Sequence, residues 1–178
     1  MSETNFKVPG IVKAKSNLTE DQEKAASELI GFIGSPWSDT DFIHALVGAG
    51  GVGKTYTLKY VIQNCKYSYS CIAAAAPTHK ACRVLTTSLN NIIKAYTIQS
   101  MFGFRLDVNI DNFDPENPAF SPIGRVKLTD PSYNYKILIV DEASMLNVKL
   151  VKYIISKCKA AKIKIIFVGK SIADVKFF

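Results

Sequence analysis

The stretch VGAGGVGKTYTL, residues Val47–Leu58, decides the fold class. An apolar run of strand length, DFIHALV at 41–47, leads into it, and a helical pattern from Lys54 to about Asn64 begins inside it. Glycines let a backbone approach another molecule closely, and the lysine among them suggests that this molecule is negatively charged. Strand, glycine-rich loop and helix in this order predict a phosphate-binding loop, although a glycine-rich turn could match by chance.

The loop matches G-x-x-x-x-G-K-[ST] through Gly48, Gly53, Lys54 and Thr55. Its N–H groups would surround a phosphate, and the helix N-terminus would add positive potential. We expect Lys54 to bridge the β- and γ-phosphates as a catalytic residue, and Thr55 to bind Mg²⁺ through its hydroxyl. The residues expected to line the nucleotide are Gly48, Ala49, Gly50, Gly51, Val52, Gly53, Lys54, Thr55 and Tyr56.

A carboxylate pair, Asp141 and Glu142, directly follows the apolar run ILIV. We expect Asp141 to hold the magnesium, usually through water, and Glu142 to act as general base on the attacking water. The alternative is a solvated helix cap. Together, the loop and the pair predict a protein that binds and hydrolyses ATP with Mg²⁺.

The rest of the chain alternates apolar strands with helices, which predicts an α/β fold: a parallel sheet flanked by helices, of the RecA-like P-loop NTPase kind. An amphipathic helix at 18–34 opens it, with a capping box from Thr19 to Gln22 and glycines at 31 and 34 marking its exit. The other expected elements are strands within 70–77, 135–146 and 162–169 and helices at 79–91 and 147–161.

Three segments fall outside this pattern. Residues 1–17 are expected to form an N-terminal arm, and 170–178 an atypical tail. Residues 103–135, rich in turn-forming residues, are too long for an ordinary connection. They predict either a disordered insertion or a small inserted subdomain within the domain at 18–169.

The amino-acid composition excludes few classes of protein. The 178 residues suit one domain, and no apolar run reaches the ~18 residues of a membrane span. The N-terminus lacks a secretory pattern, so we expect a cytoplasmic protein, in the host cytoplasm if it is viral, with no membrane partner. Its four cysteines show no metal-ligand spacing and are expected to be reduced thiols. The net charge of +7 suits a polyanionic partner, or reflects only that lysine is common on the surface.

Five motifs occur in one order: LTEDQ (18–22), GAGGVGKT (48–55), APTHKACRVL (76–85), TIQSMFG (97–103) and ILIVDEASML (137–146). This order resembles superfamily 1 DNA helicases of the RecD/Dda-like branch, with phage members nearest in pattern. The resemblance covers 18–169 and corresponds to the first of the family's two motor domains. It implies an ATP-dependent helicase of DNA replication, repair or recombination that moves along single-stranded DNA.

The resemblance also implies roles for single residues. Gln22 matches an adenine-reading glutamine, and its role in the capping box can hold as well. Pro77, Thr78 and His79 match a motif that lies along single-stranded DNA, and Thr97 and Gln99 match a second, in which the family usually has histidine in place of the glutamine. A helix cap at Thr78 and His79 is the alternative.

Residues 103–135 match a subdomain that bears a strand-separating pin in related helicases. Its aromatic residues would stack on bases or fill the subdomain's core; they include Phe104, Phe113 and Phe120.

The resemblance stops after Gly169. Lys170 stands where the family has aspartate, and Ala173 where it has a glutamine that senses the γ-phosphate. A second motor domain with its arginines is therefore expected on a separately encoded partner, or lost. We expect the isolated chain to bind ATP, to hydrolyse it poorly and not to unwind DNA. A truncated or split-gene remnant that binds nucleotide or single-stranded DNA is the alternative function, and a small nucleotide kinase fits the motifs poorly.

Overall fold

The computed structural model describes residues 17–106, 120–122 and 127–170. The arm through residue 16 and the tail from residue 171, with Ala173, lie outside the described residues. So do Phe113 and the side chains of Phe104 and Phe120.

Five parallel strands form the central sheet, which confirms the expected fold class. Their spatial order is β1 (Ile43–Val47), β7 (Lys164–Gly169), β6 (Ile137–Val140), β2 (Ile72–Ala76) and β3 (Ala95–Thr97). A separate antiparallel pair joins β4 (Phe104–Leu106) to β5 (Phe120–Pro122).

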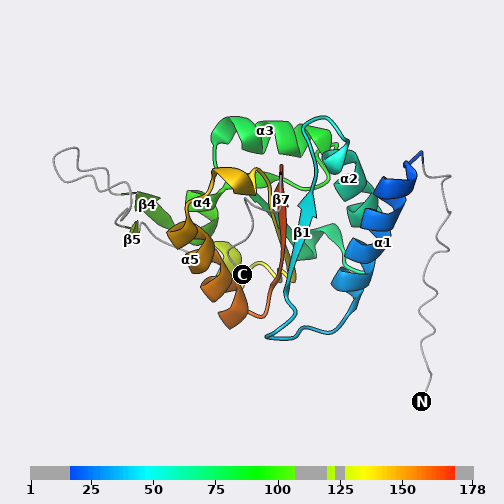
Figure 1. Cartoon of the computed structure of the whole chain (residues 1–178). Coiled ribbons are helices and arrows are strands. Elements are labelled where there is room, and N and C mark those ends of the chain that lie inside the picture. Colours follow the sequence, from blue (N-terminus) through cyan, green and yellow to red (C-terminus); the bar gives the residue numbers. More distant parts are fainter. Residues whose placement is uncertain (1–16, 107–119, 123–126, 171–178) are drawn as a thin grey trace, which may run out of the picture.

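Helices cover both faces of the sheet, so the molecule has three layers (Figure 1). One face packs against α1 (Glu20–Gly34), α2 (Lys54–Asn64) and α3 (His79–Ser88). The other packs against α4 (Ile98–Phe102) and α5 (Val148–Ala160). Three short 3₁₀ turns, η1 (Tyr69–Cys71), η3 (Lys127–Thr129) and η4 (Ala143–Met145), complete the described elements. Within the described ranges, no helix has both the length and the apolar character needed to cross a bilayer.

Strand β2 shows why the sheet is buried on both sides. Its five residues, IAAAA, are all at most 2% exposed. Ala74 and Ala76 belong to the core under α1, α2 and α3, whereas Ala73 and Ala75 belong to the core under α4 and α5. Such small side chains let both helical layers come close to the sheet, as expected for a strand inside a parallel α/β fold.

Helix α1 begins with the expected capping box. Thr19 Oγ1 accepts a hydrogen bond from the Gln22 N–H, and Gln22 Oε1 accepts one from the Thr19 N–H at 3.0 Å. The helix ends at Gly34, as predicted, with Gly31 inside its last turn and Ser35 as the cap. The amino-terminal end of α1 is therefore fixed by its own side chains, next to the glycine-rich loop.

A buried lysine holds the other end of α1. Lys164, on β7, is only 3% exposed, and its ammonium donates to the Phe32 carbonyl, to Ser35 O at 2.8 Å and to Ser35 Oγ at 2.6 Å. Burial lowers its pKa. These acceptors lie at the carboxyl end of a helix, where carbonyl groups lack partners within the helix and the dipole favours a cation.

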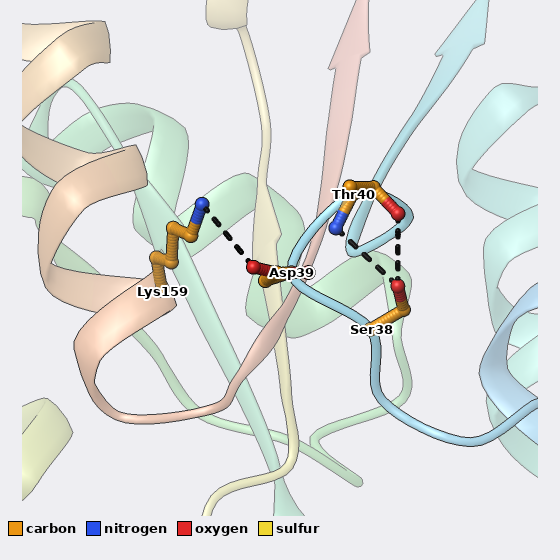
Figure 2. Close-up of polar contacts among 4 residues, drawn as sticks. All are labelled: Ser38, Asp39, Thr40 and Lys159. Atoms are coloured by element: carbon orange, nitrogen blue, oxygen red, sulfur yellow. Dashed lines mark hydrogen bonds and ion pairs between the residues drawn. The ribbon is translucent and has the colours of Figure 1, made fainter.

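The loop between α1 and β1 is tied to the end of α5. Figure 2 shows Asp39 facing Lys159 at 4.0 Å, and beside it the Ser38 hydroxyl bonding to Thr40 Oγ1 at 3.0 Å and accepting from the Thr40 N–H at 3.3 Å. Both charged side chains are more than half exposed, so the pair contributes little to stability.

Between α3 and β4 the structure differs from the sequence prediction. Helix α3 ends at Ser88 rather than 91, because Asn90 and Asn91 both have positive φ and turn the chain back. The edge strand β3 and helix α4 then follow, neither of which the sequence predicted.

The β4–β5 pair lies beyond α4 and α5, away from the sheet (Figure 1). Leu128, near the end of the proposed inserted subdomain, is instead 2% exposed in the core with Phe102. The chain from η3 onward thus packs on the main body, and a small subdomain between α4 and η3 remains a proposal.

Candidate functional site

The glycine-rich loop has the backbone geometry of a phosphate cradle. Gly51 and Gly53 both have φ of 82°, a conformation that residues with a side chain rarely adopt. Gly53 is also the N-cap of α2, where no side chain bonds the free N–H groups of the first turn. Unbonded N–H groups and the helix dipole make this end of α2 suited to an anion.

Lys54 folds back over this loop. Its ammonium donates to the Gly48 carbonyl at 2.7 Å and to the Ala49 carbonyl at 2.8 Å. Gly48 is close-packed as well, since an added Cβ would lie 2.9 Å from Val52 Cγ2. The lysine is thus held at the mouth of the loop, where its charge faces the space that a phosphate would occupy.

Gln22 braces the same loop from helix α1. Its Nε2 donates to the Val52 carbonyl at 3.0 Å, while its Oε1 belongs to the capping box. Thr19, Gln22, Val52 and Lys54 line one cavity of about 570 Å³ between α1 and the loop. The side chain therefore serves the cap and lines this cavity, and its contact with adenine stays a prediction.

The carboxylate pair lies at the end of β6, next to the loop. The Asp141 N–H donates to the Ala75 carbonyl, and Asp141 Oδ1 accepts from the Glu142 N–H, both at 2.9 Å. Burial raises the Asp141 pKa, the Glu142 N–H and the Lys54 charge oppose this rise, and the Glu142 charge adds to it. Burial is the largest of these effects on the Asp141 pKa.

Glu142 has an uncommon backbone conformation. Its φ is 52°, in the left-handed region that few residues with a side chain adopt, and its side chain is exposed. It is the N-cap residue of η4, but its side chain makes no capping hydrogen bond. The alternative of a side-chain helix cap therefore does not apply to Glu142.

The donor types at the loop fit Mg²⁺. This ion prefers oxygen ligands, and proteins hold it through one or two side chains together with substrate phosphates and water. Thr55 offers a hydroxyl at the start of α2, and Asp141 offers a carboxylate at the end of β6, with Oδ1 accepting from the Glu142 N–H. No group of three or more His, Cys, Asp or Glu side chains gathers into a metal site within the described ranges. Such a donor set matches an ion that arrives with a nucleotide.

The residues expected along DNA divide between two hollows. Thr78 lines a cavity of about 220 Å³ with Asp141 and Glu142, whereas His79 and Thr97 line a groove of about 1050 Å³. Pro77 and Gln99 are half-buried at the starts of α3 and α4, outside the lining of both hollows.

Both threonines cap helices. Thr78 Oγ1 accepts from the Ala81 N–H at 3.1 Å, and Thr97 Oγ1 accepts from the Ser100 N–H at 3.2 Å. The capping role that the sequence offered as an alternative is therefore present at Thr78. His79 is exposed.

Tyr56, which the sequence analysis expects to line the nucleotide, is not among the residues that line the cavity between α1 and the loop. Tyr56 is 46% exposed on α2 and lines a small cavity with Lys59. The groove is also lined by Arg83 and Tyr96, which the sequence analysis did not single out. These side chains come together because β3 pairs with β2 and is also hydrogen-bonded to α3 through Thr86.

A family model described as an AAA domain matches residues 39–172. The chain belongs to the AAA-domain family. This match begins just before β1 and includes the glycine-rich loop, the Asp141–Glu142 pair and the last strand of the sheet.

A comparison with solved structures bears on the fold. The AAA-domain chain matches the crystal structure of Pif1 helicase from Candida albicans with a TM-score of 0.50 and 17% sequence identity, over 85% of this chain and 32% of that one. At this identity the likeness shows the fold alone, a parallel α/β sheet flanked by helices. The chain spans about a third of the length of the Pif1 chain. No curated protein matches it.

Proposed function

We propose that this chain is the ATP-binding motor domain of an ATP-dependent DNA helicase of the RecD/Dda-like branch of superfamily 1, near its phage members. In the complete enzyme it would couple ATP hydrolysis to movement along single-stranded DNA. One observation carries the proposal: the glycine-rich loop with Lys54 and the carboxylate of Asp141 both follow the carboxyl ends of parallel strands, β1 and β6, of the same sheet. Binding of Mg·ATP requires a phosphate-binding loop for the phosphates and a carboxylate for the metal at the carboxyl ends of the strands of one sheet.

The nucleotide would take over bonds that the loop now makes with itself. Within the described part of the chain, the Lys54 ammonium donates to two backbone carbonyls, and phosphate oxygens can replace them without leaving its charge unpaired. Gln22 would hydrogen-bond to adenine through the donor and acceptor positions of its amide that the capping box and the bond to Val52 leave unused.

Asp141 and Thr55 would hold Mg²⁺, which when bound would neutralise charge on the β- and γ-phosphates. Glu142, exposed at the end of the same strand, is the group placed to take a proton from the attacking water. Its backbone strain fits a residue held in position for chemistry.

The nucleic-acid residues adjoin this centre. Thr78 shares its cavity with Asp141 and Glu142, so DNA bound at the start of α3 would act close to the hydrolytic pair. Pro77, His79, Thr97 and Gln99 are proposed as further contacts. A second motor domain, on this chain or on a separate one, would close over the site and add arginines, which in related systems raise the rate by about 10³–10⁵.

ATP turnover, measured with and without single-stranded DNA, tests this function. We expect slow turnover by the isolated chain, stimulation by DNA, and a loss of about 10²–10⁴ in Glu142→Gln with Mg·ATP binding retained. Lys152→Ala, an exposed lysine of α5, is the matched surface control. Turnover in Glu142→Gln equal to that of the unsubstituted chain would refute the assignment.

A further inference from the structure

A long groove runs between helix α3 and the edge strand β3. We call it the α3–β3 groove; it encloses about 1050 Å³, and Arg83, Thr86, Lys94, Tyr96 and Ser100 are among its lining residues. No aspartate or glutamate lines it within the described part of the chain. The groove thus presents cationic and hydroxyl-bearing side chains to whatever enters it.

Its positive charge is available to a ligand. Arg83 and Lys94 are both exposed, and neither has an ion-pair partner among the described residues. They come from opposite walls, Arg83 from the middle of α3 and Lys94 from the residue before β3. Two unpaired cations facing one groove without acidic neighbours indicate a ligand with repeated negative charges.

The ring of Tyr96 lies close to two lysine ammonium groups on the β3 side of the groove. The ammonium of Lys127 lies 3.9 Å from the centre of its ring, and that of Lys94 lies 5.4 Å away. The ring is half-buried against the core under α4 and α5, so it is a fixed support for both lysines. Its role is to position Lys94 rather than to stack on a base, because the two ammonium groups already occupy its surroundings.

The edge of the sheet is not free to take up an extended peptide at this point. Thr86 Oγ1 accepts a hydrogen bond from the Ala95 N–H at 2.9 Å, so an added strand would lose that donor. The Thr86 hydroxyl keeps its own hydrogen for an acceptor in the groove, such as a phosphate oxygen. This favours a polyphosphate chain over a peptide strand.

We propose that the α3–β3 groove binds the phosphodiester backbone of single-stranded DNA, with Arg83 and Lys94 as phosphate ligands and Tyr96 as the residue that positions Lys94. The inference rests on the proposed function, since His79 and Thr97 lie in the same groove. It extends the DNA path from the carboxyl ends of the strands down the β3 edge. Because the contacts are to phosphates, binding is salt-dependent and indifferent to base sequence.

Fluorescence anisotropy of a labelled oligothymidylate, titrated at several salt concentrations, tests the proposal. Each lost phosphate contact should reduce the slope of log affinity against log salt by about 0.7. Arg83→Ala with Lys94→Ala should therefore reduce it by about 1.4 and weaken binding about tenfold at low salt. Tyr96→Ala should weaken binding, and Tyr96→Phe, which keeps the ring, should not.

The matched control is Lys152→Ala with Lys157→Ala on α5. Lys157 lies 5.3 Å from the centre of the Tyr153 ring, which reproduces the Lys94–Tyr96 arrangement on the other face of the sheet. This control should bind as the unsubstituted chain does, and urea unfolding and Mg·ATP binding check that each variant is folded.

The outcomes separate the two proposals. If the unsubstituted chain binds the oligonucleotide and the groove variant matches it in affinity and salt slope, the groove assignment is wrong while the proposed function stands. If the unsubstituted chain does not bind, both are wrong. Equally tight binding of polyglutamate would show a general polyanion site and overturn the assignment to nucleic acid.

Discussion

Replacing Gly53 by alanine should destabilise the fold more than the same replacement at Gly51, although both glycines have φ of 82°. Their surroundings differ: a Cβ at Gly51 would have nothing within 4 Å, whereas a Cβ at Gly53 would collide with Gln22 Nε2. Gly51→Ala therefore measures backbone strain alone. Gly53→Ala adds the displacement of Gln22 from the loop.

The expected magnitudes follow from these contacts. A left-handed residue with a Cβ costs about 1–2 kcal/mol, which both variants incur. Displacing Gln22 loses its 3.0 Å hydrogen bond to Val52, worth about 0.5–1.5 kcal/mol. Gly53→Ala should thus lower the free energy of unfolding by about 1 kcal/mol more than Gly51→Ala.

Urea unfolding of a double-mutant cycle isolates this difference. In a Gln22→Ala background the colliding amide is gone, so the two glycine substitutions should agree within about 0.5 kcal/mol. A difference that persists after Gln22 is removed, or equal costs while Gln22 is present, would refute the reasoning that Gln22 braces the loop.

Three further predictions concern stability. Burial lowers the His44 pKa below 6.5, so as pH falls the unfolded chain binds this proton before the folded chain does, and the free energy of unfolding decreases from pH 6.5 towards the lowered pKa. Urea unfolding at pH 7.5 and 5.5 should show a smaller decrease in His44→Phe than in the unsubstituted chain, and an equal decrease would contradict the prediction. Lys164→Met leaves carbonyls at the end of α1 without their donor and should lower the free energy of unfolding in urea by about 1–3 kcal/mol. A decrease below about 0.5 kcal/mol would show that this lysine does not hold the end of α1. Asp39→Ala removes the exposed pair with Lys159 and should cost less than about 1 kcal/mol; a larger loss would mean that the pair is coupled to more than the α1–β1 loop.

The features that the sequence predicted well are local ones. The glycine-rich loop, the capping box of α1 and the carboxylate pair after β6 each depend on residues a few positions apart, so their spacing reveals them. The alternation of apolar strands and helices was likewise enough to predict a parallel sheet, because strands buried on both faces need no polar alternation.

The features that it missed depend on contacts between distant parts of the chain. Strand β3 has three residues, too few for a period, and exists because it pairs with β2. Lys164 lies in an apolar strand where a buried cation is unexpected, and only the end of α1, about 130 residues earlier, explains it. The α3–β3 groove combines a helix, a turn and an edge strand, and no single stretch signals it.

Gln22 shows how one side chain can cap a helix and reach a second element of the fold. The sequence offered a helix cap or an adenine contact. In the structure the carbonyl end of the amide serves the cap, while the amino end reaches the loop. Because an amide has two separate ends, the carbonyl end serves the cap while the amino end bonds to Val52, and the adenine contact stays a prediction.

Calorimetric titration of Mg·ATP into the purified chain tests the central claim most directly, with Lys54→Ala and Lys152→Ala titrated alongside. We expect saturable binding by the unsubstituted chain and by Lys152→Ala, and at least about a tenfold loss in Lys54→Ala, since its charge-assisted hydrogen bonds to phosphate are worth about 1.5–3 kcal/mol. No uptake of Mg·ATP by folded protein, or unchanged affinity in Lys54→Ala, would contradict the account.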